Sequence, residues 1–162
     1  MLNECVFCDW VKENTKNILE NQFFICRFNN YPVSPGHVLI IPKRHVVNLA
    51  DLNVDEWNEL KNFIKEVVEL IEKTDLKKVY EEKFKNPIDD NSEWFCKKAI
   101  NHPRINTKPD AYNYGVNDGK AAGRTVDHFH WHIIPRFDGD MDDPRGGVCY
   151  VIPEMGNYKI PR

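Results

Sequence analysis

The segment His128-Phe129-His130-Trp131-His132-Ile133-Ile134 alternates imidazole and apolar side chains. Successive side chains of a β-strand point to opposite faces, so this pattern predicts a strand with three histidines on one face and an apolar opposite face. The apolar face can pack against a core. Three imidazoles on one face repel one another when protonated and contribute little to packing. We therefore interpret the histidine face as a functional site.

Two kinds of chemistry fit this histidine face. Imidazoles two residues apart can share a metal ion, or they can surround a phosphate as a nucleophile and hydrogen-bond donors. The preceding loop favours an anion, because it offers backbone N–H groups, two cations and a hydroxyl. Those loop residues are Gly119, Lys120, Gly123, Arg124 and Thr125.

The pair Cys5-Val6-Phe7-Cys8 has the two-residue spacing with which two thiolates hold one tetrahedral zinc, and it supplies half of such a site. A redox pair would be expected between a strand and a helix of a thioredoxin-like unit, and the sequence near Cys8 does not offer that order. The chain has five cysteines at irregular spacing, which is unlike a disulfide framework. From the residues alone, the pair is either half a metal site or two ordinary thiols.

The rest of the chain predicts an α+β fold. Short apolar runs predict strands at 22–28, 37–42, 111–116 and 129–135. Apolar residues recur at spacings of three and four residues and predict a long helix from Val54 to about Lys73. Asn53 and Glu56 have the spacing of a capping box at its start. The Lys- and Glu-rich segment 74–110 is expected to be a surface insertion with a short helix at 92–100. We expect residues 1–162 to form a single domain in which a long helix packs on an antiparallel sheet.

The charge balance limits the partners that the protein can attract. The 22 basic and 25 acidic side chains give a net charge of -3, so no general attraction to nucleic acid or to a membrane surface is expected. The N-terminal residues lack the basic and apolar regions of a secretory signal, and no apolar run approaches the ~20 residues that span a bilayer. We therefore expect a cytoplasmic protein whose phosphate site is local.

The run from His128 to Ile134 matches the His-x-His-x-His-x-x pattern, with x apolar, of the histidine triad (HIT) family. The segment from Gly36 to His45 resembles the strand region that precedes the family's helix, and Asn117 lies eleven residues before His128. The resemblance covers most of residues 5–137, except 74–110. It implies a HIT-like fold and an enzyme that hydrolyses or transfers nucleotides.

The resemblance also implies roles for individual residues. His130 would attack the α-phosphorus of a dinucleoside polyphosphate, such as diadenosine tetraphosphate, or of a nucleoside phosphoramidate, and form a nucleotidyl-histidine intermediate. His132 and Asn117 would bind phosphate oxygens or position the ring, and Thr125 would contact the bridging or leaving atom. The substrate would also meet Asn29, Lys120, Gly123 and Arg124. Arg124 stands where the family often has Gln, and Asn29 stands where many members have an Asp facing the ribose.

Several relatives that carry the N-terminal cysteine pair complete a structural zinc site with two histidines, which here would be His45 and His128 together with Cys5 and Cys8. The resemblance further implies a homodimer that pairs through the long helix and a sheet edge. Two alternatives stay open. One is a metallohydrolase that holds an open zinc with the triad histidines, and the other is a non-catalytic nucleotide-binding adaptor that uses 74–110 to recruit partners.

Overall fold

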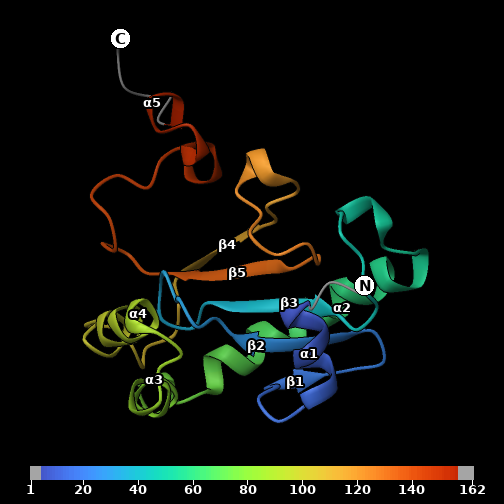
Figure 1. Cartoon of the computed structure of the whole chain (residues 1–162). Coiled ribbons are helices and arrows are strands. Elements are labelled where there is room, and N and C mark those ends of the chain that lie inside the picture. The colour runs from blue at the N-terminus through green and yellow to red at the C-terminus, as the bar shows by residue number, and fades with distance from the viewer. Residues whose placement is uncertain (1–4, 157–162) are drawn as a thin grey trace.

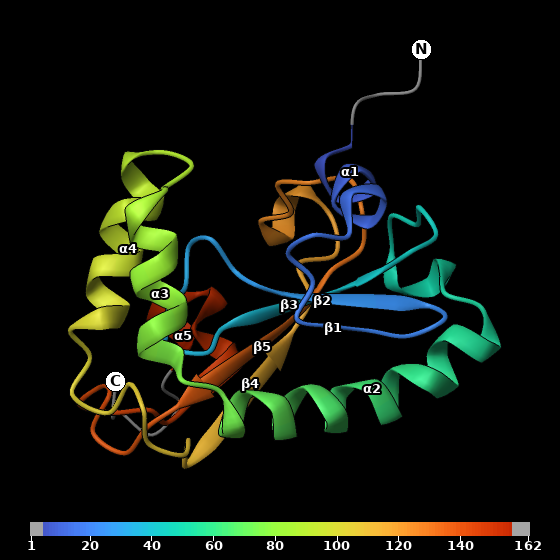
Figure 2. The same ribbon diagram turned by 90° about the horizontal axis from the view of Figure 1, so that it is seen from below.

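The computed structural model describes residues 5–156 and has the predicted α+β architecture. Five strands form one antiparallel sheet in the order β1-β2-β3-β5-β4. Their bounds are β1 Leu19–Glu20, β2 Phe24–Phe28, β3 Val38–Pro42, β4 Ala111–Gly115 and β5 Trp131–Arg136. The sheet lies between a short helix, α1 (Val6–Glu13), and a long one, α2 (Val54–Lys73), as Figures 1 and 2 show from two directions.

Helix α2 begins and is capped as the sequence predicts. The Asn53 side chain accepts a hydrogen bond from the Glu56 backbone N–H at 2.9 Å, and the Glu56 carboxylate accepts one from the Asn53 N–H at 2.8 Å. This reciprocal pair satisfies two N–H groups that have no partner within the helix. The buried stripe of α2 then packs on the sheet and forms the main core together with Phe24, Cys26, Phe28, Val38, Ile40 and Ile133.

Helix α1 covers the opposite face of the sheet. Its buried Phe7 packs with Ile25, Leu39 and Ile41 in a second, smaller apolar cluster. The sequence pattern does not predict α1, because its eight residues bury only one large side chain. Its position matters because Cys8 lies within it and Cys5 directly precedes it.

The segment 74–110 is more than the surface insertion that was predicted. It forms two helices, α3 (Leu76–Lys85) and α4 (Asp90–Ile100), and contributes five buried residues to the main core: Leu76, Tyr80, Cys96, Ala99 and Ile105. Figure 2 shows the two helices side by side at one end of the sheet. Most of the Lys and Glu side chains of these helices are exposed, and the apolar residues that face the core are too widely spaced to form an obvious run in the sequence.

The histidine strand starts later than predicted. Strand β5 begins at Trp131, while His128 lies in a bend and His130 directly precedes the strand. The Phe129 N–H donates to the Val46 carbonyl at 2.7 Å, so this residue pairs with the loop after β3. Three short 3-10 helices, Leu49–Asp51, Lys120–Ala122 and Gly147–Val151, and the one-turn α5 (Pro153–Gly156) complete the described structure. Across residues 5–156, no helix has both the length and the apolar character needed to cross a bilayer.

Candidate functional site

His132 and His37 form a hydrogen-bonded pair at the centre of the sheet. Leu39 of β3 is the register partner of His132 in β5, and His37 directly precedes β3. His37 Nε2 lies 3.0 Å from His132 Nδ1. The Val33 N–H donates to His37 Nδ1 at 3.4 Å, which places the proton of a neutral His37 ring on Nε2. His37 then donates to His132, whose own proton lies on Nε2.

His132 Nε2 is therefore a hydrogen-bond donor, and it has no partner in the described part of the chain. The atom is buried, and no acceptor for it exists among residues 5–156. Leaving a buried donor unpaired costs about 1–3 kcal/mol. A donor kept in this state is suited to a ligand that brings its own acceptor, such as a phosphate oxygen.

His130 presents the complementary atom, a free lone pair. Its Nδ1 lies 2.9 Å from the carbonyl oxygen of His128. A carbonyl can only accept, so Nδ1 carries the ring proton and Nε2 of the neutral ring has its lone pair available. The His130 and His132 ring centroids are 5.0 Å apart, and Phe7 packs edge-on against the His130 ring. The site thus places a nucleophilic nitrogen beside an unpaired donor.

Burial keeps these imidazoles neutral near pH 7. It is the main cause that lowers the pKa of His132 to about 4 and the pKa of His37 to about 3, with further lowering from neighbouring histidines. Burial likewise lowers the pKa of His130, although its hydrogen bond to the His128 carbonyl acts in the opposite direction. The tautomers described above therefore apply at neutral pH.

The third triad histidine, His128, belongs to a separate cluster with Cys5, Cys8 and His45. One potential ligand atom from each of the four lies within 4.8 Å of the others. His128 Nδ1 is 3.4 Å from Cys5 Sγ and 3.6 Å from Cys8 Sγ, and His45 Nδ1 is 3.2 Å from Cys8 Sγ. The His128 Nε2–H donates to the Pro42 carbonyl at 2.9 Å, which leaves Nδ1 free for a metal. Two thiols and two imidazoles at these separations fit one tetrahedral cation.

The cluster divides the predicted histidine face in two. Within the described range, this is the group that could hold a metal, and it contains neither His130 nor His132. The structure thus brings together the four residues predicted as ligands and keeps them apart from the pair predicted to act on phosphate.

The loop before the histidines differs from the sequence expectation. The backbone N–H groups of Ala122, Gly123 and Arg124 donate to the carbonyls of Gly119 and Lys120 within the loop. These amides are therefore not available to a phosphate, contrary to the expectation from the sequence. The side chains remain accessible, since Asn117, Lys120 and Thr125 are exposed.

Arg124 lies near His130, but acidic neighbours balance its charge. Its guanidinium donates to Asp127 at 3.1 Å and to Asp118 at 3.3 Å, and also to the Val47 carbonyl and the Asn48 side chain. The remaining positive field still contributes to lowering the pKa of His130. Arg124 thus fixes the loop onto the segment after β3 as well as lying beside the site.

Asn29 and His37 extend the site toward β2. The Asn29 Nδ2 lies 3.4 Å from His37 Nε2, and its Oδ1 accepts from the Tyr31 N–H. Asn29 was predicted as a site residue from the sequence, whereas His37 was not. The sequence signal for His37 is its position at the start of the apolar run 38–42. In the structure it is 3% exposed and directly precedes a fully buried strand.

Comparison with known proteins identifies the family and agrees with the fold. The HIT domain model matches residues 11–139. A 16.1 kDa HIT-like protein of Mycoplasma pneumoniae is 25% identical over 98% of this chain and 85% of its own length. The asymmetrical bis(5'-nucleosyl)-tetraphosphatase of Schizosaccharomyces pombe is 32% identical over 71% of this chain and 46% of its own. A solved zinc-bound histidine triad family protein from Mycobacterium smegmatis is 25% identical, with a TM-score of 0.52 and coverage of 86% and 80%. This chain belongs to the HIT family, whose fold it has.

Proposed function

We propose that the protein cleaves dinucleoside polyphosphates at the α-phosphate through a nucleotidyl-histidine intermediate on His130. The observation that carries the proposal is the pairing of a free His130 Nε2 lone pair with the unpartnered His132 Nε2–H. A nucleophile and a fixed donor on one side of a phosphorus are what nucleophilic catalysis at a phosphate requires. The relationship to the S. pombe tetraphosphatase supports the substrate class.

The reaction would proceed in two displacements. His130 Nε2 attacks the α-phosphorus, a P–N bond forms, and the bond to the bridging oxygen breaks, so that the remaining polyphosphate departs with the electron pair. The His132 Nε2–H donates to a phosphoryl oxygen whose negative charge grows in the transition state. Water then attacks the same phosphorus, the P–N bond breaks, and a proton passes to solvent. Throughout, the His130 Nδ1–H stays hydrogen-bonded to the His128 carbonyl.

The remaining residues would bind the substrate. Asn117 would position phosphate oxygens together with His132, Thr125 would contact the leaving oxygen, and Asn29 would meet the ribose. Lys120, Gly123 and Arg124 would lie along the polyphosphate. Because Asp118 and Asp127 already compensate Arg124, we expect the exposed Lys120 to supply much of the cationic attraction.

We further propose that zinc occupies the Cys5, Cys8, His45 and His128 cluster in a structural role. The geometry of the four ligand atoms and the zinc-bound M. smegmatis relative support this. Four protein ligands leave no open position for substrate, so zinc would hold α1 on the sheet and take no part in the reaction. His130, whose Nδ1 is engaged by a carbonyl, lies outside the cluster, which counts against the open-zinc alternative.

A homodimer is also part of the proposal. Strand β4 lies at an edge of the sheet, and Tyr114 on it is 40% exposed. Open edges favour pairing with another chain. Light scattering should give about twice the 19.1 kDa mass of one chain, and a monomer at all working concentrations would overturn the assignment.

The central test is His130→Ala. We expect turnover of diadenosine tetraphosphate to vanish while the melting temperature and mononucleotide affinity stay close to the native values. Rapid quenching and mass spectrometry of the native protein should detect an adduct of one nucleotidyl group on His130. His102→Ala is the matched control, because His102 packs on Phe137, and that variant should keep full turnover. Substantial turnover by His130→Ala would refute the role of His130.

A further inference from the structure

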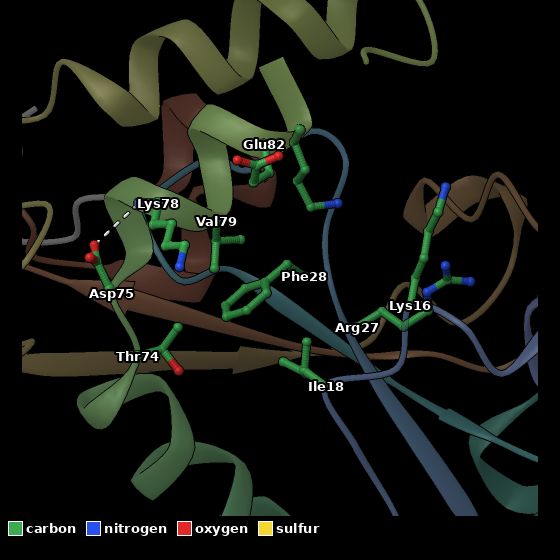
Figure 3. Close-up of a pocket in the computed structure, with 10 residues that line it drawn as sticks. Lys16, Ile18, Arg27, Phe28, Thr74, Asp75, Lys78, Val79 and Glu82 are labelled. Carbon is green, nitrogen blue, oxygen red and sulfur yellow. Dashed lines mark hydrogen bonds between the residues drawn. The ribbon is translucent and has the colours of Figure 1, made fainter. Parts of the chain in front are cut away.

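A cavity beside strand β2 is lined by a buried arginine that none of the preceding proposals uses. This cavity of about 320 Å³ lies between α1, β2 and the α3–α4 pair, and Trp10, Glu13 and Arg27 line it. A larger cavity of about 480 Å³ shares Lys16, Arg27, Glu82 and Lys83 with it. Figure 3 shows the larger cavity, with Arg27 and Lys16 together at one end and the α3 residues Lys78, Val79 and Glu82 opposite.

Arg27 lies on the same face of the sheet as the catalytic histidines. It pairs with Leu39 in the β2–β3 register, and Leu39 pairs with His132 in the β3–β5 register. Residues directly opposite each other in antiparallel strands project to one face, and two strand spacings separate Arg27 from His132 by ~10 Å. Asn29, proposed to meet the ribose, follows Arg27 by two residues and contacts His37. A nucleotide whose phosphate lies at His132 would thus place its base in the cavity at Arg27.

The Arg27 guanidinium has hydrogen bonds to give. The side chain is only 6% exposed, and its Nη1 has no acceptor among the described residues. Its Cζ lies 4.3 Å from the centroid of the Trp10 ring. A guanidinium stacked on an indole uses its face for that contact, while its N–H donors lie in its own plane and stay available to a planar partner.

The opposite wall of the cavity is held in place. Lys83 of α3 donates to the Asn30 side chain at 2.7 Å, which ties the helix to the loop after β2. Pro87 and Ile88 add apolar lining. Glu13, at the end of α1, also lines the cavity, and its charge opposes the lowering of the Arg27 pKa that burial causes. The cavity therefore combines an aromatic ring, a forked donor and a carboxylate acceptor.

We propose that this cavity is a base subsite selective for guanine over adenine, with Arg27 as the specificity-determining residue. The inference rests on the proposed nucleotide chemistry at His130. Guanine presents O6 and N7 as adjacent acceptors, which match the arginine fork, whereas adenine places its N6 amino donor where guanine has O6. The Glu13 carboxylate is suited to accept from N1–H and the N2 amino group of guanine, which adenine lacks.

Mononucleotide binding to the native protein provides the first test. Calorimetry with GMP, AMP and 7-deaza-GMP should show GMP binding roughly 10- to 100-fold tighter than AMP, the range expected for one bidentate arginine–guanine contact. 7-deaza-GMP lacks the N7 acceptor and should bind several-fold more weakly than GMP. This measurement needs no variant and therefore does not depend on folding of a mutant.

Variants provide the second test. Arg27→Met should remove the preference for GMP, and Arg27→Lys should do the same because a lysine keeps the charge but not the fork. Lys16→Met is the matched control: Lys16 is an exposed cation on the same cavity, so its loss should weaken both nucleotides equally. Equal or tighter binding of AMP, no binding of either nucleotide, or a GMP preference that survives Arg27→Met would overturn the proposal. Guanine-selective binding without any turnover would instead refute the reaction at His130, and turnover without base selectivity would refute only the role of Arg27.

Discussion

Tyr80 connects helix α3 to the segment that leads into His37, and the contribution of this contact to the stability of the fold can be measured. Its side chain is fully buried in the core, and its hydroxyl oxygen accepts a hydrogen bond from the Gly36 N–H at 2.9 Å. Gly36 directly precedes His37 and is itself buried. Tyr80→Phe preserves the ring packing but leaves a buried amide without an acceptor, which costs about 1–3 kcal/mol of folding free energy. We expect the free energy of unfolding to decrease by that amount.

Urea denaturation measures the effect. With a slope of roughly 2 kcal/mol/M, the loss corresponds to a midpoint lowered by about 0.5–1.5 M at unchanged slope. Tyr31→Phe is the control, since its hydroxyl donates to Asp89 at the surface, where water can replace the lost bond; its midpoint should move by less than about 0.3 M. Equal midpoints for native protein and Tyr80→Phe would show that the Gly36 contact does not stabilise the fold.

Three further outcomes are expected. Cys8→Ser should lower the zinc content of protein purified without chelator and lower the melting temperature, and unchanged zinc by elemental analysis would contradict the ligand assignment. Burial lowers the pKa of His37 to about 3 and that of His132 to about 4, whereas histidines in the unfolded chain have a pKa of ~6.5, so below that pH the unfolded chain binds more protons than the folded one. The free energy of unfolding should therefore be constant above pH ~6.5 and decrease as the pH falls toward 4. A urea midpoint that is the same at pH 7 and pH 5 would contradict this. The acid limb of the turnover profile should have its midpoint below the ordinary histidine pKa of ~6.5, because burial lowers the pKa of His130 and the protonated ring cannot attack; a midpoint at or above that pH would count against the proposal.

The sequence predicted the elements whose signals are local. The Asn53 cap predicted the first residue of α2, the spacing from Trp57 to Ile71 predicted its approximate end, and the apolar runs located β2 to β5 within a few residues. The spacing of Cys5 and Cys8 suggested half a metal site, and the family resemblance added His45 and His128. The structure brings the four together although the two histidines are far apart in the chain.

The parts that could not be predicted depend on distant contacts. In the sequence Tyr80 is one aromatic residue in a charged helix, and only the folded chain shows that its ring is buried in the main core and that its hydroxyl accepts from the Gly36 N–H. The loop amides looked available for a phosphate because a sequence does not show that Gly119 and Lys120 already accept from them. Arg27 is a similar case. Alternation in β2 assigns it a face of the sheet, but only the positions of the residues around it show that its Nη1 has no acceptor within 5–156.

His128 contacts the two halves of the site through different parts of the same residue. Its imidazole faces the thiols, whereas its backbone carbonyl accepts the hydrogen bond of the His130 Nδ1–H. Any amino acid placed at position 128 retains that carbonyl. A substitution there therefore perturbs the tautomer of the nucleophile only as far as the local chain moves, and an inactive His128→Ala protein would report a displaced backbone and not a missing catalytic group.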